Sequence, residues 1–138
     1  MDTFASLHQY GDVALFMLRG IIATIFIVHG IWKLQNGAQM ATGLGKPHLN
    51  HFFTFLGAAE TLGAFALLSG FLTQLAAAGL GIIMLGALYL KIFRWKVPFT
   101  SHDKSCWEFD LMILAGCLTI FVMGAGKIAL DRTIFGLF

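Results

Sequence analysis

Four long apolar stretches, each near the length of a helix that crosses a bilayer, dominate this chain. They cover residues 13–34, 52–72, 75–93 and 109–130. The hydrocarbon core of a bilayer takes about 20 apolar residues in a helix. We therefore expect an all-α polytopic membrane protein, a bundle of four transmembrane helices, in which residues 1–138 form a single domain.

The composition favours the same fold class. Of the 138 residues, 58% are hydrophobic and only 12% are charged, whereas a soluble domain has about 25% charged residues. So few charges cannot cover the surface of a water-soluble globule of this size. The net charge of +2 and the absence of Lys/Arg runs also argue against nucleic acid as a partner. The first twelve residues contain no Lys or Arg, so we expect an uncleaved anchor rather than a signal peptide.

Basic residues are distributed unevenly between the two ends of such a bundle. The two long loops and their flanks carry Lys33, Lys46, Lys91, Arg94, Lys96 and Lys104. The end that holds both termini and the short turn at Thr73-Gln74 carries only Lys127 and Arg132. Because Lys and Arg are enriched in cytoplasmic loops, we expect both termini to lie outside the cytoplasm.

Several ionisable residues fall inside the predicted spans, where each costs roughly 2.5–3.5 kcal/mol on insertion scales. Arg19, His29 and Lys33 share one face of the first span, as judged from the helical period. Glu60 lies in the second span, and Asp110 lies at the start of the fourth. Because such residues usually face the interior of a bundle, these five define a candidate polar site.

The depths of these groups predict a first grouping of opposite charge between the first two spans. His29 and Glu60 lie within reach of each other, and Arg19 reaches toward Glu60 with its long side chain. Because an imidazole titrates near neutral pH, His29 is suited to pass protons or to bind a quinone carbonyl. A structural interpretation stays open, in which His29 is an interhelical hydrogen-bonding residue and Arg19 with Glu60 locks two helices together.

A second grouping is predicted near the loop side of the bundle. Lys33 lies at the depth of Glu108 and Asp110, which begin the fourth span. The alternative is that these residues, together with Lys91, simply extend their charged ends to the membrane interface.

Other reactive residue types form no recognisable site. Cys106 and Cys117 are spaced neither as a redox pair nor as zinc ligands. His48, His51 and His102 match no known ligand spacing, so no metal site is expected. The sequence also contains no cysteine cluster, haem-attachment motif or dinucleotide-binding fingerprint, so we expect no haem, flavin or iron–sulfur site.

Short motifs distributed along nearly the whole chain resemble, in order, those of the DoxX family. They are Arg19 with His29-Gly30 and Lys33, Glu60-Thr61-Leu62-Gly63 with Gly70-Phe71-Leu72-Thr73, and Gly124-Ala125-Gly126-Lys127 with Leu130-Asp131. The chain departs from the pattern at Gln74, where the family often has Arg. The resemblance implies a four-helix bundle in the lipid bilayer of a bacterial inner membrane, related to subunits of thiosulfate:quinone oxidoreductase.

The resemblance further implies a quinone-interacting subunit of a membrane oxidoreductase complex. Its partners would be other membrane subunits or further copies of this chain, and its cofactor a quinone. In this hypothesis His29 and Glu60 are catalytic, with His29 hydrogen-bonding or protonating the quinone and Glu60 fixing the His29 tautomer. Arg19, Lys33 and Asp110 are the cofactor-binding residues, with Arg19 and Lys33 offsetting negative charge on the reduced ring.

Two other function classes stay open at this point. A non-enzymatic subunit that assembles or stabilises a larger membrane complex would use the same charged residues as helix locks. A transporter is a weaker third possibility, because four spans would have to oligomerise to build a path and no broken helix is evident.

Overall fold

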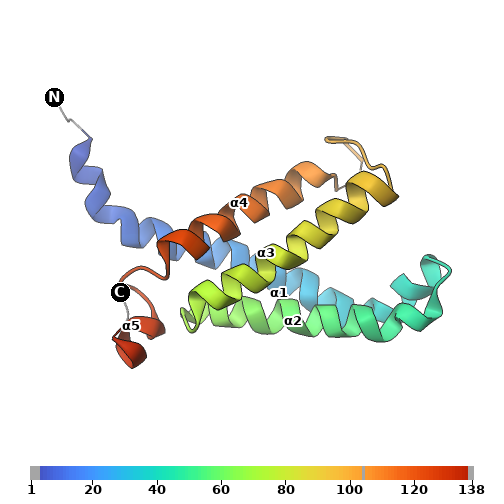
Figure 1. Cartoon of the computed structure of the whole chain (residues 1–138), viewed down its shortest axis with the longest axis horizontal. Helices are drawn as coiled ribbons and strands as arrows, with labels where there is room; N and C mark the ends of the chain where they lie inside the picture. The colour runs from blue at the N-terminus through green and yellow to red at the C-terminus, as the bar shows by residue number, and fades with distance from the viewer. Residues whose placement is uncertain (1–3, 104, 137–138) are drawn as a thin grey trace.

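The computed structural model describes residues 4–103 and 105–136, which form a bundle of helices (Figure 1). The α-helices are α1 (Gly11–Gly43), α2 (Asn50–Ser69), α3 (Thr73–Tyr89), α4 (Trp107–Met123) and α5 (Leu130–Phe135). Two 3-10 helices cover Ala5–Tyr10 and Pro47–Leu49, and a π-helix at Leu90–Arg94 continues α3. No strand occurs among the described residues. The prediction of an all-α fold is confirmed.

Three of these helices are long and apolar enough to cross a membrane. They are α1, α2, and α3 together with its π-helical continuation. The fourth, α4, has 17 residues, which span about 25 Å at about 1.5 Å per residue. The fold is thus a helical membrane bundle with three long apolar helices and a shorter fourth.

Glycines move two helix ends away from the predicted positions. α2 ends at Ser69 because Gly70 adopts a left-handed conformation with φ 73°, and α3 then begins at Thr73. α4 ends at Met123, before the predicted residue 130, because Gly124 has φ 78°. α1, in contrast, continues to Gly43, so that much of the segment predicted as a linker is helical.

The helices associate as two antiparallel pairs. α1 packs mainly on α2, and α3 packs mainly on α4, whereas contacts between the two pairs are fewer. Figure 1 shows α3 leaving α2 at their short turn and diverging from it toward the end that carries the long loops. We call this the loop end and the opposite end, which holds both termini, the terminal end. A buried core from all four helices joins the pairs, and it includes Phe26, Leu67, Leu80, Cys117 and Ile120.

Two glycines bring the backbones of α1 and α2 into contact. A Cβ added at Gly30 would lie 2.8 Å from the Gly57 carbonyl oxygen, and a Cβ at Gly57 would lie 2.8 Å from the Gly30 carbonyl oxygen. Such close crossings of membrane helices require small residues. A Cβ at Gly57 would also lie 3.0 Å from the Lys33 Cβ. Lys33 therefore lies directly against α2, one turn away from Glu60.

Candidate functional site

A cavity of about 570 Å³ lies between the helix pairs toward the loop end. Most of its wall is apolar, and this part includes Phe26, Phe53, Leu56, Ile83, Met84 and Ile113. Its ionisable lining residues are His29, Lys33, Glu60, Tyr89, Lys91 and Asp110. A mainly apolar cavity of this size with a few polar side chains is typical of a small-molecule site.

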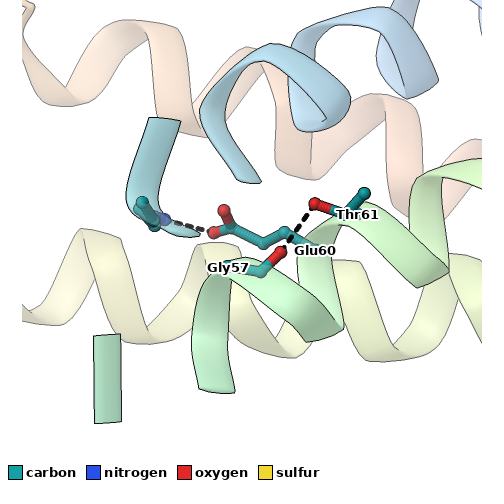
Figure 2. Close-up of polar contacts among 4 residues, drawn as sticks. Gly57, Glu60 and Thr61 are labelled. Atoms are coloured by element: carbon teal, nitrogen blue, oxygen red, sulfur yellow. Dashed lines mark hydrogen bonds and ion pairs between the residues drawn. The ribbon is translucent and has the colours of Figure 1, made fainter. Parts of the chain in front are cut away.

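The first charged pair in this cavity joins α1 to α2. The Lys33 Nζ donates to Glu60 Oε1 in an ion pair, drawn as the dashed line at Glu60 in Figure 2. The Glu60 side chain is 1% exposed and that of Lys33 is 18% exposed. Within residues 4–103 and 105–136, the second carboxylate oxygen, Oε2, has no hydrogen-bond partner. The pair thus combines a buried carboxylate that has a spare acceptor with a more accessible ammonium group.

A side-chain hydrogen bond next to Glu60 lies within α2. The neighbouring Thr61 Oγ1 donates to the Gly57 carbonyl oxygen at 2.7 Å (Figure 2). This hydrogen bond occupies the threonine hydroxyl within its own helix, so Thr61 does not compete for Glu60.

A second charged pair lines the same cavity from the other helix pair. The Lys91 Nζ lies 2.7 Å from Asp110 Oδ2, and their side chains are 18% and 9% exposed. Lys91 belongs to the π-helical continuation of α3, and Asp110 lies in the first turn of α4. π-helical turns often occur at functional sites.

His29 lines the cavity next to these pairs, although its environment differs from the expected one. Its side chain is largely exposed, and no hydrogen bond joins it to Glu60 in the described part of the chain. Both residues nevertheless border the same space. A rotation of the imidazole would be needed for it to meet the spare oxygen of Glu60.

The structure does not bring Arg19 to this cavity. Arg19 is 1% exposed, and its guanidinium group lies at the terminal end, where Nη1 donates to the Ala125 carbonyl oxygen and Nη2 donates to that of Ile128 at 2.8 Å. The predicted pairing of Arg19 with Glu60 is therefore wrong. The physical reason is that α4 ends at Met123, so the segment that follows it is not helical, and Arg19 binds two backbone carbonyl groups of this segment.

Asp131, also at the terminal end, accepts two backbone hydrogen bonds from the turn between α2 and α3. Its Oδ1 accepts the Leu72 N–H at 2.6 Å, and its Oδ2 accepts the Thr73 N–H at 2.8 Å. Partial burial raises the pKa of Asp131, but the hydrogen bonds from Thr73 and Leu72 and the charge of Arg19 outweigh this effect, so the pKa lies below its ordinary value. These contacts connect the C-terminal segment to the first turn of α3.

The second predicted grouping also has different partners. Lys33 pairs with Glu60 rather than with Asp110 or Glu108, and Glu108 accepts a hydrogen bond from the Thr100 hydroxyl at 3.1 Å. The cavity therefore contains His29, Glu60, Lys33 and Asp110 of the five predicted residues.

The sequence does not single out Lys91 as a site residue, because its position also fits an interfacial lysine. The sequence feature that could have identified it is its position at the end of the third apolar stretch. The loop that follows leads to Asp110, at the start of the fourth apolar stretch. Two consecutive antiparallel helices bring such positions to the same depth.

Side chains of α2 and α3 that are exposed on the outer surface of the bundle also line the cavity. Phe52, Ile82 and Tyr89 line it, and their exposed fractions are 52%, 68% and 57%. In a membrane this outer surface faces lipid. A molecule dissolved in the bilayer would therefore reach the cavity without passing through water.

No group of three or more His, Cys, Asp or Glu side chains suited to hold a metal ion occurs among the described residues. The charged side chains that line the cavity are those of the two lysine–carboxylate pairs.

Comparison with known proteins identifies the relatives of this chain. The family model described as DoxX matches residues 14–92. The "Uncharacterized membrane protein Rv3486" of Mycobacterium tuberculosis is 29% identical over 138 aligned residues, which cover 91% of this chain and 84% of that protein. The "Putative oxidoreductase CatD" of Bacillus subtilis is 26% identical over 125 residues, which cover 90% and 89%. No solved structure matches the chain.

Proposed function

The chain belongs to the DoxX family, and from that premise we propose that it is a quinone-interacting membrane subunit of an oxidoreductase complex in a bacterial inner membrane. The observation that carries this proposal is the grouping of His29, Lys33, Glu60 and Asp110 around one mainly apolar cavity. A relative of similar length bears the name of a putative oxidoreductase, which supports the same reaction class.

The lining of the cavity fits a quinone. A quinone ring is a flat apolar body with carbonyl oxygens at its edge, so it needs apolar walls and a small number of hydrogen-bond donors. The side chains of the walls supply the apolar surface, and the lysine ammonium groups and His29 supply the hydrogen-bond donors. The exposed position of Phe52 and Ile82 in the lining suits a ligand that carries a hydrocarbon tail and resides in the bilayer.

Each polar residue then has a specific role. A bound quinone supplies the redox chemistry, because it takes up two electrons from a partner oxidoreductase subunit and two protons. His29 donates a hydrogen bond or a proton to a carbonyl oxygen. The Lys33 ammonium stabilises negative charge at that oxygen. The spare Oε2 of Glu60 is the acceptor that holds the rotated imidazole of His29 in one tautomer.

Equilibrium binding to the protein in lipid nanodiscs tests this proposal. Trp95 lines the cavity, so quenching of tryptophan fluorescence by a short-tailed quinone reports occupancy, and Trp95→Phe identifies the signal. We expect His29→Ala and Glu60→Gln each to weaken binding by about tenfold, as for the loss of one polar contact. His48→Ala, which changes an exposed histidine outside the cavity, is the matched control. Unchanged binding and turnover in both cavity variants would contradict the proposal.

The alternative function, a non-enzymatic assembly subunit, is favoured by the contacts of Arg19. This residue binds backbone carbonyl groups instead of facing the cavity. Under this alternative Glu60→Gln lowers stability in detergent and retention of a partner subunit, while no quinone binds to the unmodified protein.

A further inference from the structure

We propose that Lys91 is a second ligand-binding residue and that the cavity therefore selects a neutral ring with acceptor oxygens on two opposite edges. This inference rests on the proposed function and specifies the class of molecule that the site takes.

The two ion pairs occupy different walls of the cavity. Lys33 and Glu60 belong to the α1–α2 pair, whereas Lys91 and Asp110 belong to α3 with its π-helical continuation and to α4. Contacts between these two helix pairs are few compared with those within each pair, and the cavity lies between the pairs. A ring that fills it therefore meets one lysine at each of two edges.

The lysines, not the carboxylates, are the accessible members of both pairs. Each lysine side chain is 18% exposed, compared with 1% for Glu60 and 9% for Asp110. An ammonium group has three N–H donors and no acceptor, and an ion pair with one carboxylate oxygen leaves donors available. The matching ligand presents one hydrogen-bond acceptor to Lys33 and a second acceptor to Lys91.

Charge balance disfavours ligands whose two acceptor groups are negatively charged. Each ammonium already has a carboxylate partner, so each pair is formally neutral. A dicarboxylate would bring two further negative charges next to the buried Glu60 and Asp110, which is unfavourable in a site of low polarity. Neutral carbonyl oxygens avoid this repulsion, and the apolar walls accommodate the ring between them.

A comparison of two ring compounds on two proteins tests this inference. The probes are 1,4-naphthoquinone and α-tetralone, which retains one of the two carbonyl groups, and binding is measured by calorimetry in nanodiscs. We expect the unmodified protein to bind the quinone about tenfold more tightly than the tetralone. In Lys91→Met combined with Asp110→Asn, which removes the pair without leaving a buried charge, we expect the two affinities to become equal within about twofold.

Matched variants separate this inference from an effect on folding. Lys127→Met changes a lysine that pairs with Asp12 at 3.4 Å at the terminal end, and we expect it to keep the tenfold preference. Lys91→Arg retains a charged hydrogen-bond donor, so this variant should keep most of the tenfold preference for the quinone. A preference for the quinone that persists in the double variant would overturn the role of Lys91 and leave the proposed function intact. Absence of quinone binding to the unmodified protein would overturn both.

Discussion

The carboxylate of Asp131 accepts the backbone N–H of Thr73 at 2.8 Å, so a residue 58 positions further along the chain caps the first turn of α3. The residue that precedes α3, Leu72, supplies no side-chain cap and has a left-handed backbone conformation with φ 48°. Such a conformation is strained for a leucine. The C-terminal segment therefore satisfies donors that the turn between α2 and α3 leaves open.

Removal of this cap should destabilise the protein. Asp131→Ala leaves the N–H groups of Leu72 and Thr73 without their acceptor, and we expect the free energy of unfolding to fall by about 1–2 kcal/mol, as for other helix caps. Thermal unfolding in detergent measures the effect. Asp103→Ala, at an exposed loop residue, should leave the melting temperature unchanged. Equal melting temperatures for all three proteins would rule out the capping role.

The cap should also depend on pH. Because the pKa of Asp131 is lowered from its ordinary value of 3.8 in the folded protein, its ionised form stabilises the fold. This contribution is complete above the ordinary pKa and is lost as the pH falls through the lowered one. The advantage of the unmodified protein over Asp131→Asn should therefore be constant above about pH 5 and narrow as the pH falls below about 4. A constant advantage over this interval would show that the charge is not involved.

Arg19→Lys should reduce stability without affecting the cavity. A lysine cannot reproduce the forked donors that reach both Ala125 and Ile128. We expect a loss of about 2 kcal/mol in the free energy of unfolding, together with unchanged quinone affinity. If the affinity fell and the stability did not, Arg19 would belong to the ligand site after all.

The crossing of α1 and α2 should not tolerate an added methyl group. Gly30→Ala places a Cβ 2.8 Å from the Gly57 carbonyl oxygen, so the helices must separate, at a cost of about 1–3 kcal/mol. Gly79→Ala is the matched control in α3, because a Cβ there meets no atom within 4 Å. The ratio of folded to aggregated protein in size-exclusion chromatography compares the two. Similar behaviour of both variants would contradict the close crossing.

The distribution of basic residues predicts that both termini lie outside the cytoplasm. Alkaline phosphatase, which is active only outside the cytoplasm, should be active when it is fused at the C-terminus. A fusion after Gly45, at the loop end, should be inactive with alkaline phosphatase and fluorescent with green fluorescent protein. The reverse pattern would invert the orientation of the bundle.

Sequence reasoning was most successful where one physical requirement dominates. The apolar stretches are long enough to span a bilayer, and this length alone predicts the all-α membrane fold. The helix ends were less predictable because they depend on backbone conformation at particular residues. Gly124 ends α4 early, although many other glycines in this chain lie within helices, where the chain does not turn.

The pairing of charges was only partly predictable. Depth along a helix axis predicts one grouping of His29 with Glu60 and another of Lys33 with Asp110, whereas the structure pairs Lys33 with Glu60 and places all four residues in the lining of one cavity. Depth does not specify how far a side chain extends, however, and the long stem of Lys33 lies along α2 to reach Glu60. The role of Asp131 was beyond sequence reasoning, because it depends on where the C-terminal segment folds back.

Native mass spectrometry of the protein released gently from its own membrane tests the central claim, that the cavity holds a quinone, most directly. We predict an added mass that corresponds to one isoprenoid quinone on the unmodified protein and on Lys127→Met. The same mass should be absent from a variant that combines His29→Ala with Lys91→Met and Asp110→Asn. Unmodified protein without any adduct, or an equal adduct on all three proteins, would contradict the claim.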